Sequence, residues 1–168
     1  LVFLLSLLFL LPDNLSYEYI DISQIIKFTL ENIESDIGFP DLVIILEEVY
    51  PFREKDLVDK MIHEIVCKGL DTLIAGIHEK RGLIIKQNQN LEILNEGFMP
   101  RKLKGKEAIV GLYGLCLITY ADCIRNNSIF AGKFGFFPID NYISSLTINE
   151  ENLNDKYLQI LLDNWVSS

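Results

Sequence analysis

Segments with helical spacing alternate with strand-like apolar runs in the first half of the chain, and this order constrains the fold more than any other feature. Apolar residues recur at helical spacing from residue 22 to 33, and a β-branched run over residues 41–47 predicts a buried strand. A second amphipathic helix is expected over residues 54–68, followed by a strand over residues 72–77. This order indicates an α/β fold of the three-layer, Rossmann-like kind, with helices on both faces of a mostly parallel sheet.

The second half of the chain is expected to add more strands and a closing helix. Residues 82–86 and 91–94 predict a hairpin, and residues 108–119 form a long apolar stretch. The other expected elements are strands over residues 134–139 and 143–148, a helical turn at 121–125 and a helix over 150–165. The hairpin and the late strands would form an insertion or a sheet edge. No repeat or linker-like tract divides the sequence, so we expect a single domain over residues 1–168.

The first eleven residues, LVFLLSLLFLL, are almost wholly apolar. A transmembrane helix needs about 20 such residues, and the polar sequence at residues 12–14 ends this run earlier. A signal peptide would carry a basic region and a small-residue cleavage site, and neither is present. We interpret the run as a buried strand or helix cut from a longer domain, so that the fold is incomplete at its N-terminus. A remnant of a signal or anchor is the alternative.

Composition argues against several classes of function. The net charge is −9, which disfavours binding to the phosphate backbone of nucleic acids. The cysteines Cys67, Cys116 and Cys123 are odd in number and lack C-x-x-C spacing, so we expect reduced core or near-core thiols in a cytoplasmic protein. His63 and His78 have no partner at metal-ligand spacing, so no zinc site is expected.

A set of short motifs follows one order along nearly the whole chain. They lie at residues 8–16 (LFLLPDNLS), 46–53 (LEEVYPFR), 71–73 (DTL), 97–102 (GFMPRK), 110–115 (VGLYGL), 133–139 and 145–149. In this order they resemble the acylneuraminate (CMP-sialate) cytidylyltransferases. In that family a strand ending in L-Q-P-T-S-P-L-R precedes a helix and a further strand. Each motif alone is weak, and the resemblance depends on the ordered set.

The resemblance implies a fold of the nucleotide-diphospho-sugar transferase type and a defined reaction. CMP would pass from CTP to an acidic sugar, sialic acid or a related nonulosonic acid, with release of pyrophosphate. It also implies a cytoplasmic homodimer that uses Mg²⁺ and has no nucleic-acid or membrane partner. The glycine-containing loop that holds the triphosphate in the family would lie before Leu1, and no such loop occurs in the chain. The resemblance therefore concerns the sugar-binding half, and this chain alone is expected to be inactive.

Three candidate substrate-binding residues follow the strand expected at 41–47. Ligands of open α/β sheets bind at the carboxyl ends of strands, where Glu47, Tyr50 and Arg53 lie. By the resemblance, Glu47 stands in the place of a substrate-contacting glutamine, and Arg53 matches an arginine of the family. The Arg53 guanidinium could bind a sugar carboxylate through two hydrogen bonds. Alternatively, Arg53 caps the next helix or forms an ion pair with a neighbour such as Asp56.

Two further arginines are weaker candidates for binding an anionic sugar or phosphate. Arg101 belongs to the basic cluster at residues 101–106, where a solvated loop charge is the alternative interpretation. Arg81 follows the strand expected at 72–77 and is the third arginine candidate. No catalytic residue is assigned, because the chain contains no motif that would supply one.

The expected metal site is degenerate. By the resemblance, the paired aspartates that hold Mg²⁺ in the family correspond to Thr147 and Asn149. Both are neutral oxygen donors, which bind Mg²⁺ far more weakly than carboxylates. Two hypotheses follow: a cytidylyltransferase completed by an N-terminal part, or an inactive homologue that acts as a binding or dimerisation module. Other nucleotide-sugar enzymes usually show a D-x-D motif, and its absence disfavours them.

Overall fold

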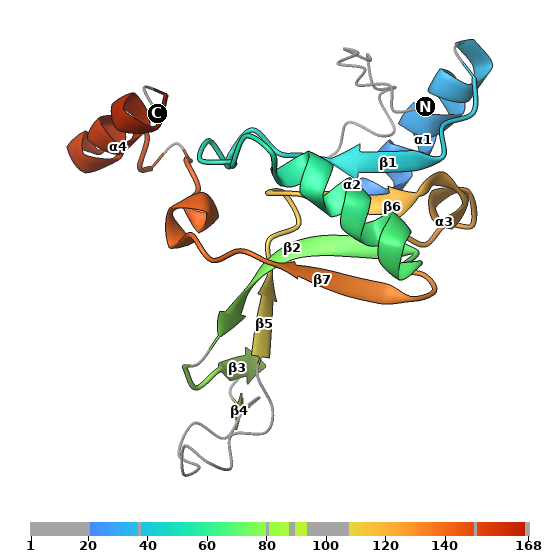
Figure 1. Ribbon diagram of the computed structural model, residues 1–168. Coiled ribbons are helices and arrows are strands. Elements are labelled where there is room, and N and C mark those ends of the chain that lie inside the picture. The colour runs from blue at the N-terminus through green and yellow to red at the C-terminus, as the bar shows by residue number, and fades with distance from the viewer. Residues whose placement is uncertain are drawn as a thin grey trace.

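The computed structural model describes residues 21–36, 38–79, 81–87, 90–93, 108–149 and 151–166 (Figure 1). The helices are α1 (Ile22–Asp36), α2 (Leu57–Lys68), α3 (Ala121–Arg125) and α4 (Lys156–Val166), with a 3-10 turn η2 (Tyr142–Ser145). The strands are β1 (Leu42–Ile45), β2 (Thr72–Glu79), β3 (Ile84–Gln87), β4 (Asn90–Ile93), β5 (Ala108–Gly111), β6 (Leu117–Tyr120) and β7 (Phe134–Pro138). The predicted order of helices and strands up to β2 is confirmed.

The main sheet has β2 at its centre. One edge of β2 pairs antiparallel with β5 and β6, and the other edge pairs parallel with β7. Strand β1 pairs antiparallel with β6 and ends the sheet among the described strands. Because β6 runs antiparallel to both β1 and β2, the strands β1, β2 and β7 all point the same way. Their carboxyl ends therefore face the same end of the sheet.

A bulge separates β5 from β6, although both pair with the same edge of β2. Gly76 lies opposite Gly111 in β5, whereas Ile74 lies opposite Leu117 in β6. Between them, Ala75 accepts a hydrogen bond from the Leu112 N–H (2.8 Å) and donates one to the Cys116 carbonyl (2.9 Å). The residues in between, which we call the β5–β6 bulge (residues 112–116), turn away from the ladder. The predicted apolar stretch at 108–119 is thus one interrupted strand.

Helices cover both faces of the sheet near β1. On one face, Leu42 and Ile44 of β1 pack with the core cluster that α2 forms against β2 and β6. On the other face, Val43 packs with Leu30 of α1 and with α3. The α/β class is therefore confirmed, with the sheet lying between helices at this end.

Two expectations about the strands are wrong. The sheet is mixed rather than mostly parallel, because β2–β7 is the one parallel pairing among the described strands. Residues 143–148 do not form a strand either. The Asn141 side chain accepts a hydrogen bond from the Ile143 N–H (3.1 Å), which caps the 3-10 turn η2 instead. The predicted hairpin is confirmed as β3 and β4.

The structure also bears on the state of the cysteines and on a possible membrane span. All three cysteines are free, and Cys116 and Cys123 are buried, but Cys67 is exposed on α2 and does not belong to the core. Within the described ranges, no helix combines the length and the apolar character needed to cross a bilayer.

Helix α2 forms because three apolar residues recur on one face and a glycine ends it. Leu57, Met61 and Ile65 are almost completely buried against the sheet. Gly69 adopts a left-handed conformation (φ 56°), which allows its N–H and that of the next residue to satisfy the last carbonyls of the helix. Through these three side chains, α2 packs against the sheet and forms part of the main hydrophobic core.

We expect Met61→Ala to lower the free energy of unfolding by about 2–5 kcal/mol, since it removes a fully buried side chain and leaves a cavity. Val66→Ala on the same helix is the matched control, because Val66 is 56% exposed. Urea denaturation of both variants would test this. Equal losses in the two variants would show that α2 is not the core helix.

Candidate functional site

The end of β1 and the β5–β6 bulge lie against each other and form the candidate site. The Glu47 N–H donates to the Gly114 carbonyl (2.7 Å), which extends the contact of β1 past its last ladder pair. Tyr50 and Arg53 follow in the loop that leads to α2. The structure therefore brings the three predicted residues of this loop to the carboxyl end of β1, at the edge that the sequence predicts.

Arg53 binds the backbone at this junction. Its Nε donates to the Leu115 carbonyl (2.7 Å), and its Nη2 donates to the carbonyls of Glu47 (3.0 Å) and Gly114 (3.2 Å). Arg53 does not pair with Asp56, whose carboxylate binds Lys60 (2.9 Å). A guanidinium has five N–H donors, and Nη1 makes no hydrogen bond to any described residue. Arg53 therefore joins the loop after β1 to the bulge, and its Nη1 has no hydrogen-bond partner among the described residues.

Glu47 and Tyr50 pack directly on the backbone of Gly114. A Cβ atom at this position would lie 2.4 Å from the Glu47 carboxylate and 2.8 Å from the Tyr50 ring. Burial, and then the negative charge of Glu47, raise the pKa of Tyr50. The phenol therefore stays protonated at neutral pH beside a carboxylate. Together they offer acceptors and one donor to a hydroxyl-rich ligand, next to the Arg53 cation.

Cys116 is a site neighbour that the sequence did not suggest. It is buried at the end of the bulge, and burial raises the pKa of its thiol to about 12, although the charge of Arg53 acts in the opposite direction. The thiol is therefore protonated and unreactive at neutral pH. The two glycines within residues 110–115 were the available signal for this bulge, since glycine inside a strand pattern often marks one.

The two remaining arginine candidates have different outcomes. Arg81 lies beyond β2, at the end where β2 pairs with β5, and forms an ion pair with Glu79 (2.5 Å). That carboxylate is nearly buried, whereas the Arg81 side chain is largely exposed, so the arginine neutralises a buried charge. Arg101 lies outside the described residues.

Thr147 and Asn149 lie beside the site but do not form a metal centre. The Ile148 N–H donates to the Val49 carbonyl (2.8 Å), which places this segment along the loop after β1. The Asn149 side-chain oxygen accepts from the Asn152 N–H (3.0 Å), and the Asn152 side chain bonds back to the Asn149 N–H (2.7 Å) and to the Thr147 carbonyl (2.9 Å).

This donor set does not fit Mg²⁺. Of the two neutral oxygens, that of Asn149 already stabilises the turn, and Mg²⁺ prefers carboxylates in octahedral geometry. The described residues also include no cluster of three or more histidine, cysteine, aspartate or glutamate side chains that could hold a metal ion. The segment therefore contributes shape and backbone contacts to the site.

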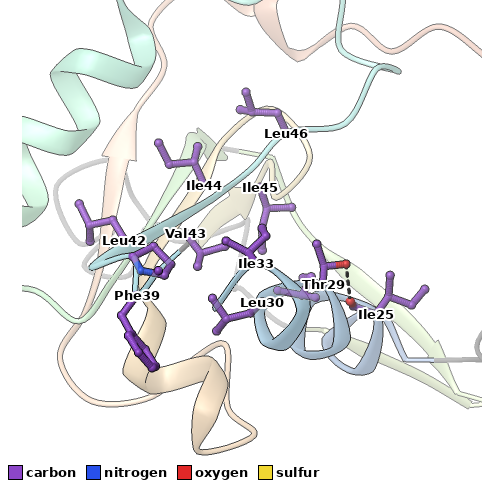
Figure 2. Close-up of a pocket in the computed structure, with 13 residues that line it drawn as sticks. Ile25, Thr29, Leu30, Ile33, Phe39, Leu42, Val43, Ile44, Ile45 and Leu46 are labelled. Atoms are coloured by element: carbon purple, nitrogen blue, oxygen red, sulfur yellow. Dashed lines mark hydrogen bonds between the residues drawn. The ribbon is translucent and has the colours of Figure 1, made fainter. Parts of the chain in front are cut away.

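A separate cavity of about 390 Å³ lies between α1 and β1 (Figure 2). Its walls carry no charged side chain and consist mainly of aliphatic residues of both elements. A sugar acid requires polar and cationic partners, so this cavity is unsuited to the predicted ligand.

We expect Arg53→Met to lower the free energy of unfolding by about 1–3 kcal/mol, because it leaves the buried Leu115 carbonyl without a donor. The Gly114 carbonyl keeps the hydrogen bond from the Glu47 N–H. The control is Lys60→Met, which breaks a surface ion pair whose two side chains are more than half exposed and which should leave stability almost unchanged, because solvent screens such pairs. Urea denaturation measures both. An Arg53→Met protein as stable as Lys60→Met would refute the structural role of Arg53.

The pKa of Tyr50 should lie above 10 and should fall only in part in Glu47→Gln, because burial is the larger cause of its shift. A raised pKa in the folded state means that this residue lowers stability as pH rises past about 10, its value in the unfolded chain. NMR titration of ¹³C-labelled tyrosine measures the pKa. A full return to the ordinary value in Glu47→Gln would show that charge, rather than burial, dominates.

Comparison with protein-family models found no match to this chain, and a search of curated protein sequences found no significant match.

Proposed function

We propose that the chain is a cytidylyltransferase-like protein that binds an acidic sugar, or its cytidine nucleotide, at the carboxyl end of β1. The observation that carries this proposal is a group of three partly buried polar side chains with unused hydrogen-bonding capacity. The Glu47 carboxylate, the Tyr50 hydroxyl and Arg53 Nη1 make no hydrogen bonds to other described residues. Partly buried polar groups of this kind are typical of a ligand site.

The chemistry of these groups matches an acidic sugar. Arg53 Nη1 can donate to a carboxylate or phosphate, and Glu47 can accept hydrogen bonds from sugar hydroxyls or from the cytosine amine. Helices on both faces of the sheet near β1 support a fold of the nucleotide-diphospho-sugar transferase type. In this proposal the reaction transfers CMP from CTP to the sugar, with release of pyrophosphate.

A second candidate is a binding module of the same type without catalysis. The hydrogen bond from the Asn152 N–H to the Asn149 side-chain oxygen favours this binding module, since the residues expected to hold Mg²⁺ form a turn instead. Such a module would bind the sugar acid or CMP and could contribute to a homodimer. The two candidates share the β1 site and differ in turnover.

Isothermal titration calorimetry with CTP, CMP and free nonulosonic acids would test binding, with a neutral hexose as the ligand control. Glu47→Gln and Tyr50→Phe should each weaken binding about tenfold, equivalent to about 1.4 kcal/mol. Glu48→Gln is the matched control because Glu48 is adjacent but exposed, and it should bind normally. If none of these ligands binds, or if Glu48→Gln has the same effect, the proposed site is wrong.

Pyrophosphate release distinguishes the two candidates. The protein expressed from its complete gene is incubated with CTP, Mg²⁺ and the same panel of acids. Release of pyrophosphate supports the transferase, whereas binding without release supports the module. Because binding is measured separately, the absence of pyrophosphate release does not by itself reject the proposed binding site.

A further inference from the structure

Strand β1 has one hydrogen-bonding edge without a partner among the described strands. The Asp41 carbonyl accepts from the Ala121 N–H (2.9 Å), so the alternation of an antiparallel ladder directs the backbone groups of Val43 and Ile45 towards β6. By the same alternation, the N–H and carbonyl groups of Leu42 and Ile44 point outward. This edge can therefore accept another strand.

The cavity between α1 and β1 surrounds this edge. Leu42 and Ile44 pack on the α2 side of the sheet and Val43 on the α1 side, yet all three line the same cavity (Figure 2). The one polar side chain in its wall, Thr29, donates its hydroxyl hydrogen to the Ile25 carbonyl (2.9 Å). The cavity is therefore an apolar groove along an open strand edge.

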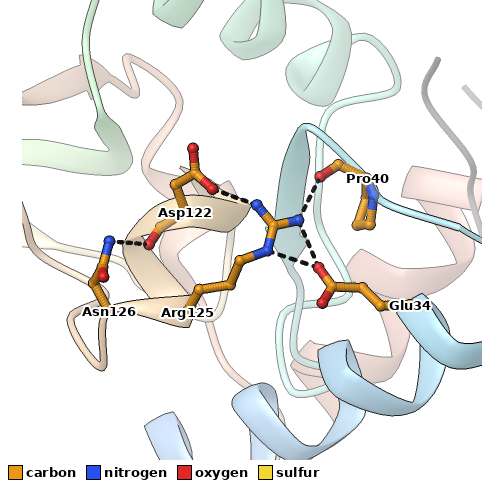
Figure 3. A network of polar contacts seen from close by, with 5 residues as sticks. All are labelled: Glu34, Pro40, Asp122, Arg125 and Asn126. Carbon is orange, nitrogen blue, oxygen red and sulfur yellow. Dashed lines mark hydrogen bonds and ion pairs between the residues drawn. The ribbon is translucent and has the colours of Figure 1, made fainter.

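A polar network next to the groove joins α1, α3 and the start of β1. Arg125 of α3 binds Glu34 of α1 through Nε (2.8 Å) and Nη2 (2.5 Å), and also pairs with Asp122 (Figure 3). Its Nη2 also donates to the Pro40 carbonyl (3.4 Å), just before β1. These bonds fix α1 relative to the start of β1, so the groove is a built feature of the fold.

The chain itself contains a segment that fits the groove. Residues 1–11 are uncharged and apolar apart from Ser6, as are the groove walls apart from Thr29. The next nine residues, 12–20, can span about 30 Å when extended, at about 3.3 Å per residue. Helix α1 has 15 residues and a length of about 22 Å, at 1.5 Å per residue. The connection therefore reaches every part of the groove.

We propose that residues 1–11 bind in this groove as an added strand on the free edge of β1. The occupant supplies backbone hydrogen bonds to Leu42 and Ile44 and apolar side chains to both walls. It also covers an edge that would otherwise pair with other chains. The proposal does not depend on the sugar-binding site, and its test measures neither nucleotides nor turnover.

Hydrogen exchange at the Leu42 and Ile44 amides, measured by NMR on the full chain, tests the proposal. A double variant, Leu5→Asp with Leu8→Asp, places charges in the groove and should accelerate exchange at these amides about tenfold or more. The control is Asn14→Asp, which adds charge outside the segment and should change nothing. Unchanged exchange at Leu42 and Ile44 in the double variant overturns the proposal.

Photo-cross-linking gives an answer even if the double variant fails to fold. A benzoylphenylalanine replaces Leu46, a groove residue that is 41% exposed, and Val66 on α2 is the control position. We expect a product of monomer mass in which residue 46 is joined to residues 1–11, and no such product from position 66. Cross-links between two chains would identify a second copy as the occupant and overturn the proposal, as would the absence of any link to residues 1–11.

Discussion

The Arg53 guanidinium is the contact on which the junction between β1, the β5–β6 bulge and α2 depends. A bulge turns carbonyls away from the ladder, and buried carbonyls without donors are costly. Arg53 supplies three of the hydrogen bonds needed, to Glu47, Gly114 and Leu115. The loop that enters α2 thereby closes onto the interrupted strand, and the carboxyl end of β1 becomes a defined surface.

The same contact changes the meaning of the family resemblance at this position. Arg53, which the resemblance would make a ligand-binding residue, donates three hydrogen bonds to backbone carbonyls through Nε and Nη2. Only Nη1 would remain for the proposed ligand. If the proposed site is correct, stability and binding are coupled through Arg53, whereas Glu47 and Tyr50 can be altered with less effect on the backbone. The bulge is also the reason that the carboxylate and the phenol meet, because Gly114 gives them the space that a side chain would take.

The carboxyl end of β1 and its free hydrogen-bonding edge have different chemistry. Its carboxyl end carries a carboxylate, a phenol and a guanidinium, while its free edge and α1 form an uncharged groove. A polar ligand and an added apolar strand would thus occupy different sides of one strand. The Arg125–Glu34 pair keeps α1 in place and so maintains the separation between them.

The sequence alone determined the local elements, since α1, α2 and the β3–β4 hairpin follow from spacing and turn residues. It also placed Glu47, Tyr50 and Arg53 near one another, because all three lie within a stretch of seven residues. Only the tertiary structure decided the partners of Arg53, the break between β5 and β6, and the mostly antiparallel pairing. It also replaced the strand expected at 143–148 with a 3-10 turn and committed Asn149 to Asn152. Some of these features are contacts between residues distant in sequence, and others depend on the hydrogen bonds of one side chain. The periodicity of apolar residues predicts neither kind of contact.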